Sequence, residues 1–163
     1  MNKLFETTPS VALLAQRLAL GAVILPHGLQ KAFGWFNGYG FDGTMGFFAS
    51  LGVPAPIALL VIVSDLLGSA ALLAGIATRA AAFGASATML GAILLWHLPN
   101  GFFMNWGGTQ AGEGFEFHLL ALGLSVPLMF LGGGAYSIDR LIARVLGSQS
   151  STSAALPSAT AAE

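Results

Sequence analysis

The chain has 163 residues, of which 55% are hydrophobic and only 8% are charged. A soluble domain carries about 25% charged residues, so this composition cannot cover a surface that faces water. The formal net charge of −1 gives no basic field for nucleic acid. These residues include no cysteine, which excludes disulfides, iron–sulfur ligation and thiol exchange by the chain itself.

The hydrophobic residues gather in four runs, each close to the ~20 residues that a helix needs to cross a bilayer. These runs cover residues 10–33, 56–77, 80–98 and 115–131. We therefore predict an all-α membrane protein in which four transmembrane helices form an antiparallel bundle. The predicted domain spans residues 1–146, and the lipid bilayer is its first partner.

The segments outside the apolar runs differ in character. Only Thr78-Arg79 joins the second and third runs, so these two helices should be adjacent and antiparallel. Residues 34–55 and 99–114 are long loops rich in glycine and aromatic residues, and the first of them can form a short helix over 44–51. Residues 137–146 have the pattern of a short amphipathic helix on a membrane surface. Residues 147–163 are predicted to be a disordered tail.

Basic side chains indicate the orientation in the membrane. One end of the predicted bundle is flanked by Lys3, Arg79, Arg140 and Arg144, whereas the other end carries Lys31 and all three tryptophans. By the positive-inside rule both termini are cytoplasmic. Small residues along the second and third helices favour close helix packing and a homo-oligomer.

Two ionisable residues lie deep within the predicted spans. Arg17 is two turns into the first helix and Asp65 is near the middle of the second, where an unpaired charge costs several kcal/mol. We predict an Arg17–Asp65 bridge, because a long arginine side chain can reach across the expected gap. A static clasp that fixes helix register is the alternative to a functional role.

A second group of ionisable residues lies nearer the non-cytoplasmic end. It comprises His27, Lys31, His97, Glu116 and His118, contributed by three different helices. Such groups at the rim of an apolar bundle suit an amphipathic ligand such as a quinone. The alternative is that His97, Glu116 and His118 are helix-end residues in the headgroup region. We predict no metal site, since no histidine pair has ligand spacing, and a haem between two histidines would leave Arg17, Lys31 and Asp65 without a role.

Several stretches resemble one family of small bacterial membrane proteins. The sequence RLALGAVILPHGLQKAFGWF, residues 17–36, is similar to the first helix of the DoxX family. It is followed in the expected order by SDLLGSAALLAGIATRAAA, by His97 before NGFF, by GFEFHLLAL and by GGGAYSID. The matching family positions are Arg17, His27, Lys31, His97, Glu116 and Asp139. Asp65 departs from the pattern, because glutamate is usual there.

The resemblance implies a four-helix protein of the bacterial inner (plasma) membrane. DoxX-like proteins include subunits of thiosulfate:quinone oxidoreductases and of assemblies linked to thiol and oxidative-stress defence. We therefore expect a membrane subunit of an oxidoreductase that binds quinone and works with a redox partner protein. The candidate catalytic residues are His27, Asp65 and Glu116, and the candidate ligand-binding residues are Arg17, His27, Lys31, His97 and His118. A non-catalytic scaffold or small-solute carrier is the alternative.

Overall fold

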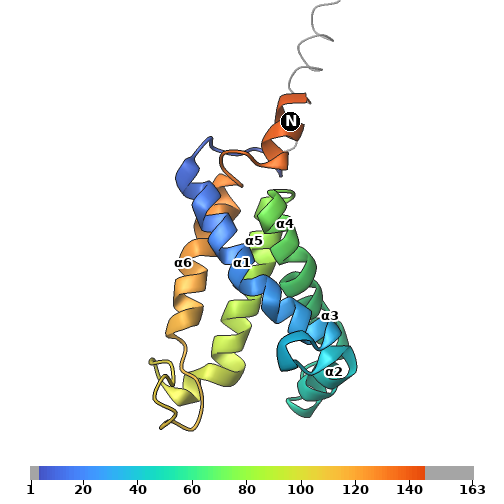
Figure 1. The fold of residues 1–163 in the computed structure, drawn as a ribbon, viewed down its shortest axis with the longest axis vertical. Helices are drawn as coiled ribbons and strands as arrows, with labels where there is room; N and C mark the ends of the chain where they lie inside the picture. Colours follow the sequence, from blue (N-terminus) through green and yellow to red (C-terminus); the bar gives the residue numbers. More distant parts are fainter. Residues whose placement is uncertain (1–3, 146–163) are drawn as a thin grey trace, which may run out of the picture.

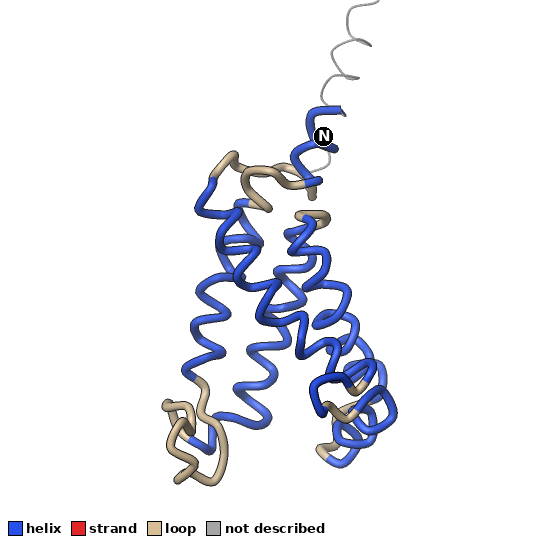
Figure 2. The backbone as a smooth tube through the Cα atoms, viewed as in Figure 1, coloured by secondary structure: helices blue, strands red, loops and turns tan. Residues whose placement is uncertain are grey.

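The computed structural model describes residues 4–145, and within this range the regular structure is entirely helical (Figures 1 and 2). The α-helices are α1 (Val11–Phe33), α2 (Gly40–Ser50), α3 (Ala55–Val63), α4 (Ser69–Ala74), α5 (Thr78–Ala92) and α6 (Glu116–Leu131). Residues 138–145 are also helical. The sequence predicted a short amphipathic helix over residues 137–146, and the structure confirms a helix in this segment. The predicted tail over 147–163 lies outside the described residues.

Among the described residues, three helical segments are long and apolar enough to cross a membrane. They are α1, the segment Ala55–Ala74 formed by α3 and α4, and the segment Thr78–Asn100 that begins with α5. The fourth apolar run forms the shorter helix α6. All four predicted runs are thus helical, and the observed helix bounds differ from the predicted ones by at most three residues.

Local chemistry explains the limits of α1. The Ser10 hydroxyl accepts from the amide of Leu13 and caps the start of the helix. At the other end Gly34 adopts a left-handed conformation, with φ of 74°, and its amide donates to the Gln30 carbonyl. The helix continues through Pro26. One face of α1 is buried along its length and carries Arg17 within it.

The helices pack as two contacting pairs. Helix α5 lies along α6, while α1 crosses α4 and also contacts α6 (Figure 1). Small and aliphatic side chains fill the core between them: Leu13, Leu20, Ile24, Leu72, Ala82, Ala85, Met89, Ala121 and Leu128. The N-terminal segment and the 138–145 helix lie at one end of the molecule, and α2 lies at the other (Figure 1).

Helix α2 begins four residues before the predicted start at Thr44. The chain turns sharply through Trp35–Asn37 and then enters the helix at Gly40, whose φ of 68° few other residues adopt. Thr44 is buried, and its hydroxyl donates to the Lys31 carbonyl at 3.2 Å. This hydrogen bond holds α2 against the end of α1.

Candidate functional site

Asp65 and Lys31 form an ion pair inside the apolar bundle. The Nζ atom of Lys31 lies 2.6 Å from Oδ2 of Asp65, and the two side chains are 28% and 2% exposed. The second carboxylate oxygen, Oδ1, is buried and has no hydrogen-bond partner. Asp65 therefore retains an unused acceptor in an apolar environment.

The backbone around Asp65 departs from α-helical geometry. Residues Ser64–Gly68 form a π-helical turn between α3 and α4, a feature often found at functional sites. The Ser69 hydroxyl donates to the Asp65 carbonyl at 2.5 Å. Gly28 of α1 lies directly against this turn, since a Cβ atom there would be 2.5 Å from the Asp65 carbonyl carbon and oxygen. The close approach brings Lys31, one turn further along α1, within reach of Asp65.

The predicted Arg17–Asp65 bridge is wrong. The buried Arg17 guanidinium donates only to backbone carbonyls among the described residues. These carbonyls belong to Leu72, Leu73, Gly133, Ala135 and Tyr136. Arg17 instead joins α1 to the end of α4 and to the segment that follows α6.

The reason for this arrangement is the supply of carbonyls that can still accept at a helix end, although the Leu72 carbonyl also accepts from the Gly75 amide. The last four carbonyls of a helix have no intrahelical partner, and Leu72 and Leu73 lie in the last turn of α4, which ends at Ala74. The Asp139 carboxylate does not pair with Arg17. Its oxygens accept from the amides of Ala77 and Thr78, at 2.7 and 2.8 Å, and so cap α5.

The histidines form a second cluster. His97 ends a π-helical turn, Ile93–His97, and its ring lies against that of His118, with centroids 4.1 Å apart. Nδ1 of His97 lies 2.8 Å from the Glu113 carbonyl oxygen, so this nitrogen is the donor. Nδ1 of His118 is buried and has no partner. One imidazole nitrogen is thus available for another molecule.

His27 lies one turn before Lys31 on α1, and its side chain is exposed. Glu116, which was also expected at this site, makes its hydrogen bonds to the loop before α6. Its Oε1 accepts from the Met104 amide at 3.1 Å and from the Trp106 indole at 3.4 Å, which ties down the loop before α6.

Sequence reasoning overlooked two features that shape this site. Sequence reasoning did not single out Gly28, although a glycine on a membrane-spanning helix can mark a close helix contact. The buried Ser64 hydroxyl has no partner, and it lies where a Cβ on Gly84 would come within 2.7 Å. Between residues 4 and 145, no three His, Asp or Glu side chains are grouped closely enough to hold a metal ion.

The arrangement defines an integral membrane protein with ionisable side chains inside its apolar helices. The chain belongs to the DoxX family, since residues 12–98 match the sequence pattern described as DoxX. It is 30% identical to "Putative oxidoreductase CatD" of Bacillus subtilis (strain 168) over 142 residues, covering 87% of this chain and 92% of that protein. It is 36% identical to "Inner membrane protein YqjF" of Escherichia coli (strain K12) over 110 residues, covering 67% and 79% respectively. No solved structure matches the chain.

Proposed function

We propose that this chain is the membrane subunit of an oxidoreductase system, with four helices crossing the bacterial inner membrane and both termini in the cytoplasm. The shorter helix α6 packs along α5, and α5 begins the segment Thr78–Asn100, which is long enough to cross by itself. Arg79, Arg140 and Arg144 belong to the same end of the bundle, which supports a cytoplasmic assignment for that end. The domain extends over residues 1–146. The relative named a putative oxidoreductase supports the reaction class.

The proposed ligand is a quinone head group, and the observation that carries this proposal is the unpartnered Oδ1 of Asp65 beside Lys31. A quinone presents carbonyl acceptors, and its reduced form presents hydroxyl donors. Asp65 can accept from a hydroxyl, while Lys31 and an imidazole N–H can donate to a carbonyl. The donor and acceptor types in the site therefore fit both forms of such a ring.

The side chains have separate roles in this proposal. Lys31, rather than Arg17, is the ion-pair partner that holds the Asp65 carboxylate in place. Asp65 and His27 exchange protons with the ligand, and the His97–His118 pair lies further along the same route. Arg17 positions the helices that form the site. When bound, quinone supplies two-electron redox chemistry. Since carboxylate, ammonium and imidazole groups move protons and not electrons, a partner protein supplies the electrons.

Purification of the full chain with its native lipids tests the proposal. Quinone would be extracted and measured by chromatography from the wild type and from the Asp65→Asn and His27→Ala variants. We expect quinone at a constant ratio to wild-type protein and a loss of at least about tenfold in Asp65→Asn, the change expected when a charge-assisted hydrogen bond is lost.

The matched control is Asp42→Asn, which removes an exposed carboxylate from α2. It should leave the quinone content unchanged. Wild-type protein without quinone, and co-purifying partners that persist in both site variants, would favour the non-catalytic scaffold. Solute flux into vesicles that depends on Asp65 would favour the carrier.

A further inference from the structure

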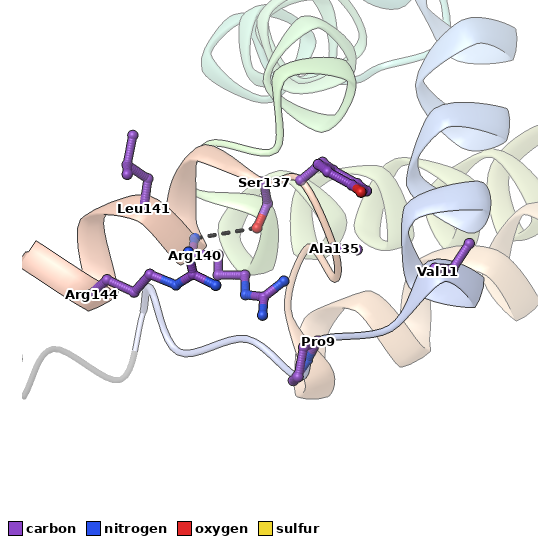
Figure 3. A pocket seen from close by; sticks show the side chains of 8 residues that line it. Pro9, Val11, Ala135, Ser137, Arg140, Leu141 and Arg144 are labelled. Carbon is purple, nitrogen blue, oxygen red and sulfur yellow. Dashed lines mark hydrogen bonds between the residues drawn. The ribbon is translucent and has the colours of Figure 1, made fainter.

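A separate pocket lies at the opposite end of the bundle from α2. It has a volume of about 480 Å³ and lies between the start of α1 and the 138–145 helix (Figure 3). Its lining combines two arginines with apolar and small residues: Pro9, Val11, Ala135, Tyr136, Ser137, Arg140, Leu141 and Arg144. None of these residues takes part in the site around Asp65.

The positive charge in this pocket is not neutralised by the described part of the chain. Arg140 and Arg144 are one helical turn apart, and the Arg140 side chain extends toward Pro9 while the Arg144 side chain extends toward Arg140 (Figure 3). Within residues 4–145, neither guanidinium group has a carboxylate within 4.0 Å. The ion pair found in this range is Lys31–Asp65. The adjacent Asp139 carboxylate is directed to the amides of Ala77 and Thr78.

The other two arginines of the described chain differ from this pair. Arg17 donates to five backbone carbonyls, and Arg79 donates to the carbonyls of Glu6 and Met129. Both are therefore engaged in holding the backbone. Arg140 and Arg144 make no such side-chain hydrogen bond among the described residues. The paired N–H donors of their guanidinium groups are therefore available for an anion.

The wall opposite the arginines is fixed by hydrogen bonds. The Ala135 amide donates to the Ser10 carbonyl at 2.9 Å, and the Gly134 amide donates to the Thr7 hydroxyl at 2.7 Å. Arg17 holds the same segment through the carbonyls of Ala135 and Tyr136. The Ser137 hydroxyl accepts from the Arg140 amide and fixes the start of the next helix. The pocket is therefore preorganised before any ligand binds.

Apolar surface adjoins the two charges. Val11 is 70% exposed and Leu141 is 61% exposed. Val11 is the first residue of α1, so the pocket lies where an apolar helix meets the aqueous phase. A free phosphate gains no binding energy from exposed aliphatic side chains, whereas a phospholipid presents both a phosphate and acyl chains that can contact them.

We propose that this pocket binds the headgroup phosphate of an anionic phospholipid from the cytoplasmic leaflet. Arg140 and Arg144 bind the phosphate, and the acyl chains pack against Val11 and Leu141 as they extend from the pocket. The choice of leaflet rests on the proposed orientation, in which this end is cytoplasmic and therefore faces anionic lipid. The site is independent of the quinone proposal.

The test measures lipid preference of the full chain by native mass spectrometry. Detergent-purified protein is titrated with phosphatidylglycerol and with phosphatidylcholine of the same acyl composition. We expect the wild type to prefer phosphatidylglycerol, and the Arg140→Gln/Arg144→Gln double variant to lose about 30-fold of that preference. The matched control Arg79→Gln removes a basic group at the same end but should keep the preference.

A charge-preserving variant separates the site from general attraction to an anionic surface. In Arg140→Lys/Arg144→Lys the charges remain but the planar forks are lost, so the preference should fall to an intermediate value. Equal binding of both lipids by the wild type, or an unchanged preference in the double glutamine variant, would overturn the proposal. So would full retention in the lysine variant, or displacement of the lipid by millimolar inorganic phosphate, since the ligand would then be free phosphate.

Discussion

Lys31 on α1 reaches Asp65 on the neighbouring π-helical turn at 2.6 Å because Gly28, three residues earlier, lets the two backbones touch. The pair is asymmetric, since the lysine is partly exposed and the carboxylate is almost completely buried. Removing the lysine therefore leaves a buried charge without compensation. This asymmetry makes the contributions of the two residues separable by mutation.

A double-mutant cycle should reveal strong coupling between the two residues. Lys31→Met should reduce the free energy of unfolding by about 3–5 kcal/mol, because it strands the Asp65 carboxylate. Lys31→Met/Asp65→Leu should recover most of that loss, since no buried charge remains. Denaturant unfolding in detergent measures the free energy of unfolding of the wild type, the two single variants and the double variant. A double variant whose loss equals the sum of the two single losses would show that the pair is not coupled.

The contact at Gly28 should tolerate no side chain. In Gly28→Ala the added Cβ would overlap the Asp65 backbone, which cannot give way as a flexible side chain can. We expect a loss of about 1–3 kcal/mol, typical of overpacking. Gly123→Ala in α6 is the control, because a Cβ there meets no atom within 4 Å. Its stability should stay level or rise by about 0.5–1 kcal/mol, and the same result for Gly28→Ala would contradict the close approach.

The apolar helices were predictable because length and hydropathy determine whether a segment can cross a bilayer. The observed segment Ala55–Ala74 lies within three residues of the predicted run. The π-helical turns at Ser64–Gly68 and Ile93–His97 were not predictable. Such a turn shifts a hydrogen bond by one residue and leaves no mark in composition, although it changes the direction of every side chain that follows.

The partners of the buried charges were only partly predictable. Hydropathy identified Arg17 and Asp65 as residues that need partners, and both have them. Depth counted along the helices assigned Asp65 to Arg17, because side chains are visible in a sequence and free backbone carbonyls are not. The carbonyls of Leu72 and Leu73 become available only where α4 ends and α1 crosses it.

Glu116 provides a test of proton relay against loop anchoring. Its Oε1 accepts from the Met104 amide and the Trp106 indole, and glutamine retains an oxygen acceptor. Glu116→Gln should therefore preserve quinone content, whereas Glu116→Ala should increase amide hydrogen exchange around Met104. Loss of quinone in Glu116→Gln to the level of Asp65→Asn would instead assign Glu116 to the proton route.

Asp139 should act as a remote cap for α5. Both of its oxygens bind amides at the start of that helix, and Ala77 adopts a strained φ of 47° there. Asp139→Ala should reduce stability by about 1–2 kcal/mol, as loss of an N-cap does, and Asp139→Asn should lose less because one acceptor remains. Thermal unfolding of the wild type, Asp139→Asn and Asp139→Ala measures this order of stability. A destabilisation in Asp139→Asn equal to that in Asp139→Ala would show that charge matters more than the acceptor geometry.

Arg17 should hold three chain segments together through geometry as well as charge. Its guanidinium serves carbonyls on both α4 and residues 133–136, and lysine keeps the charge but has three donors where arginine has five. Arg17→Met should lose at least about 3 kcal/mol, because buried carbonyls are left unpaired, and Arg17→Lys should lie between it and the wild type. Hydrogen exchange at the Ala135 amide, which donates to the Ser10 carbonyl, should rise in the same order. If Arg17→Lys matched the wild type in both measurements, charge alone would explain the residue, and the array of carbonyls would have no role in fixing the fold.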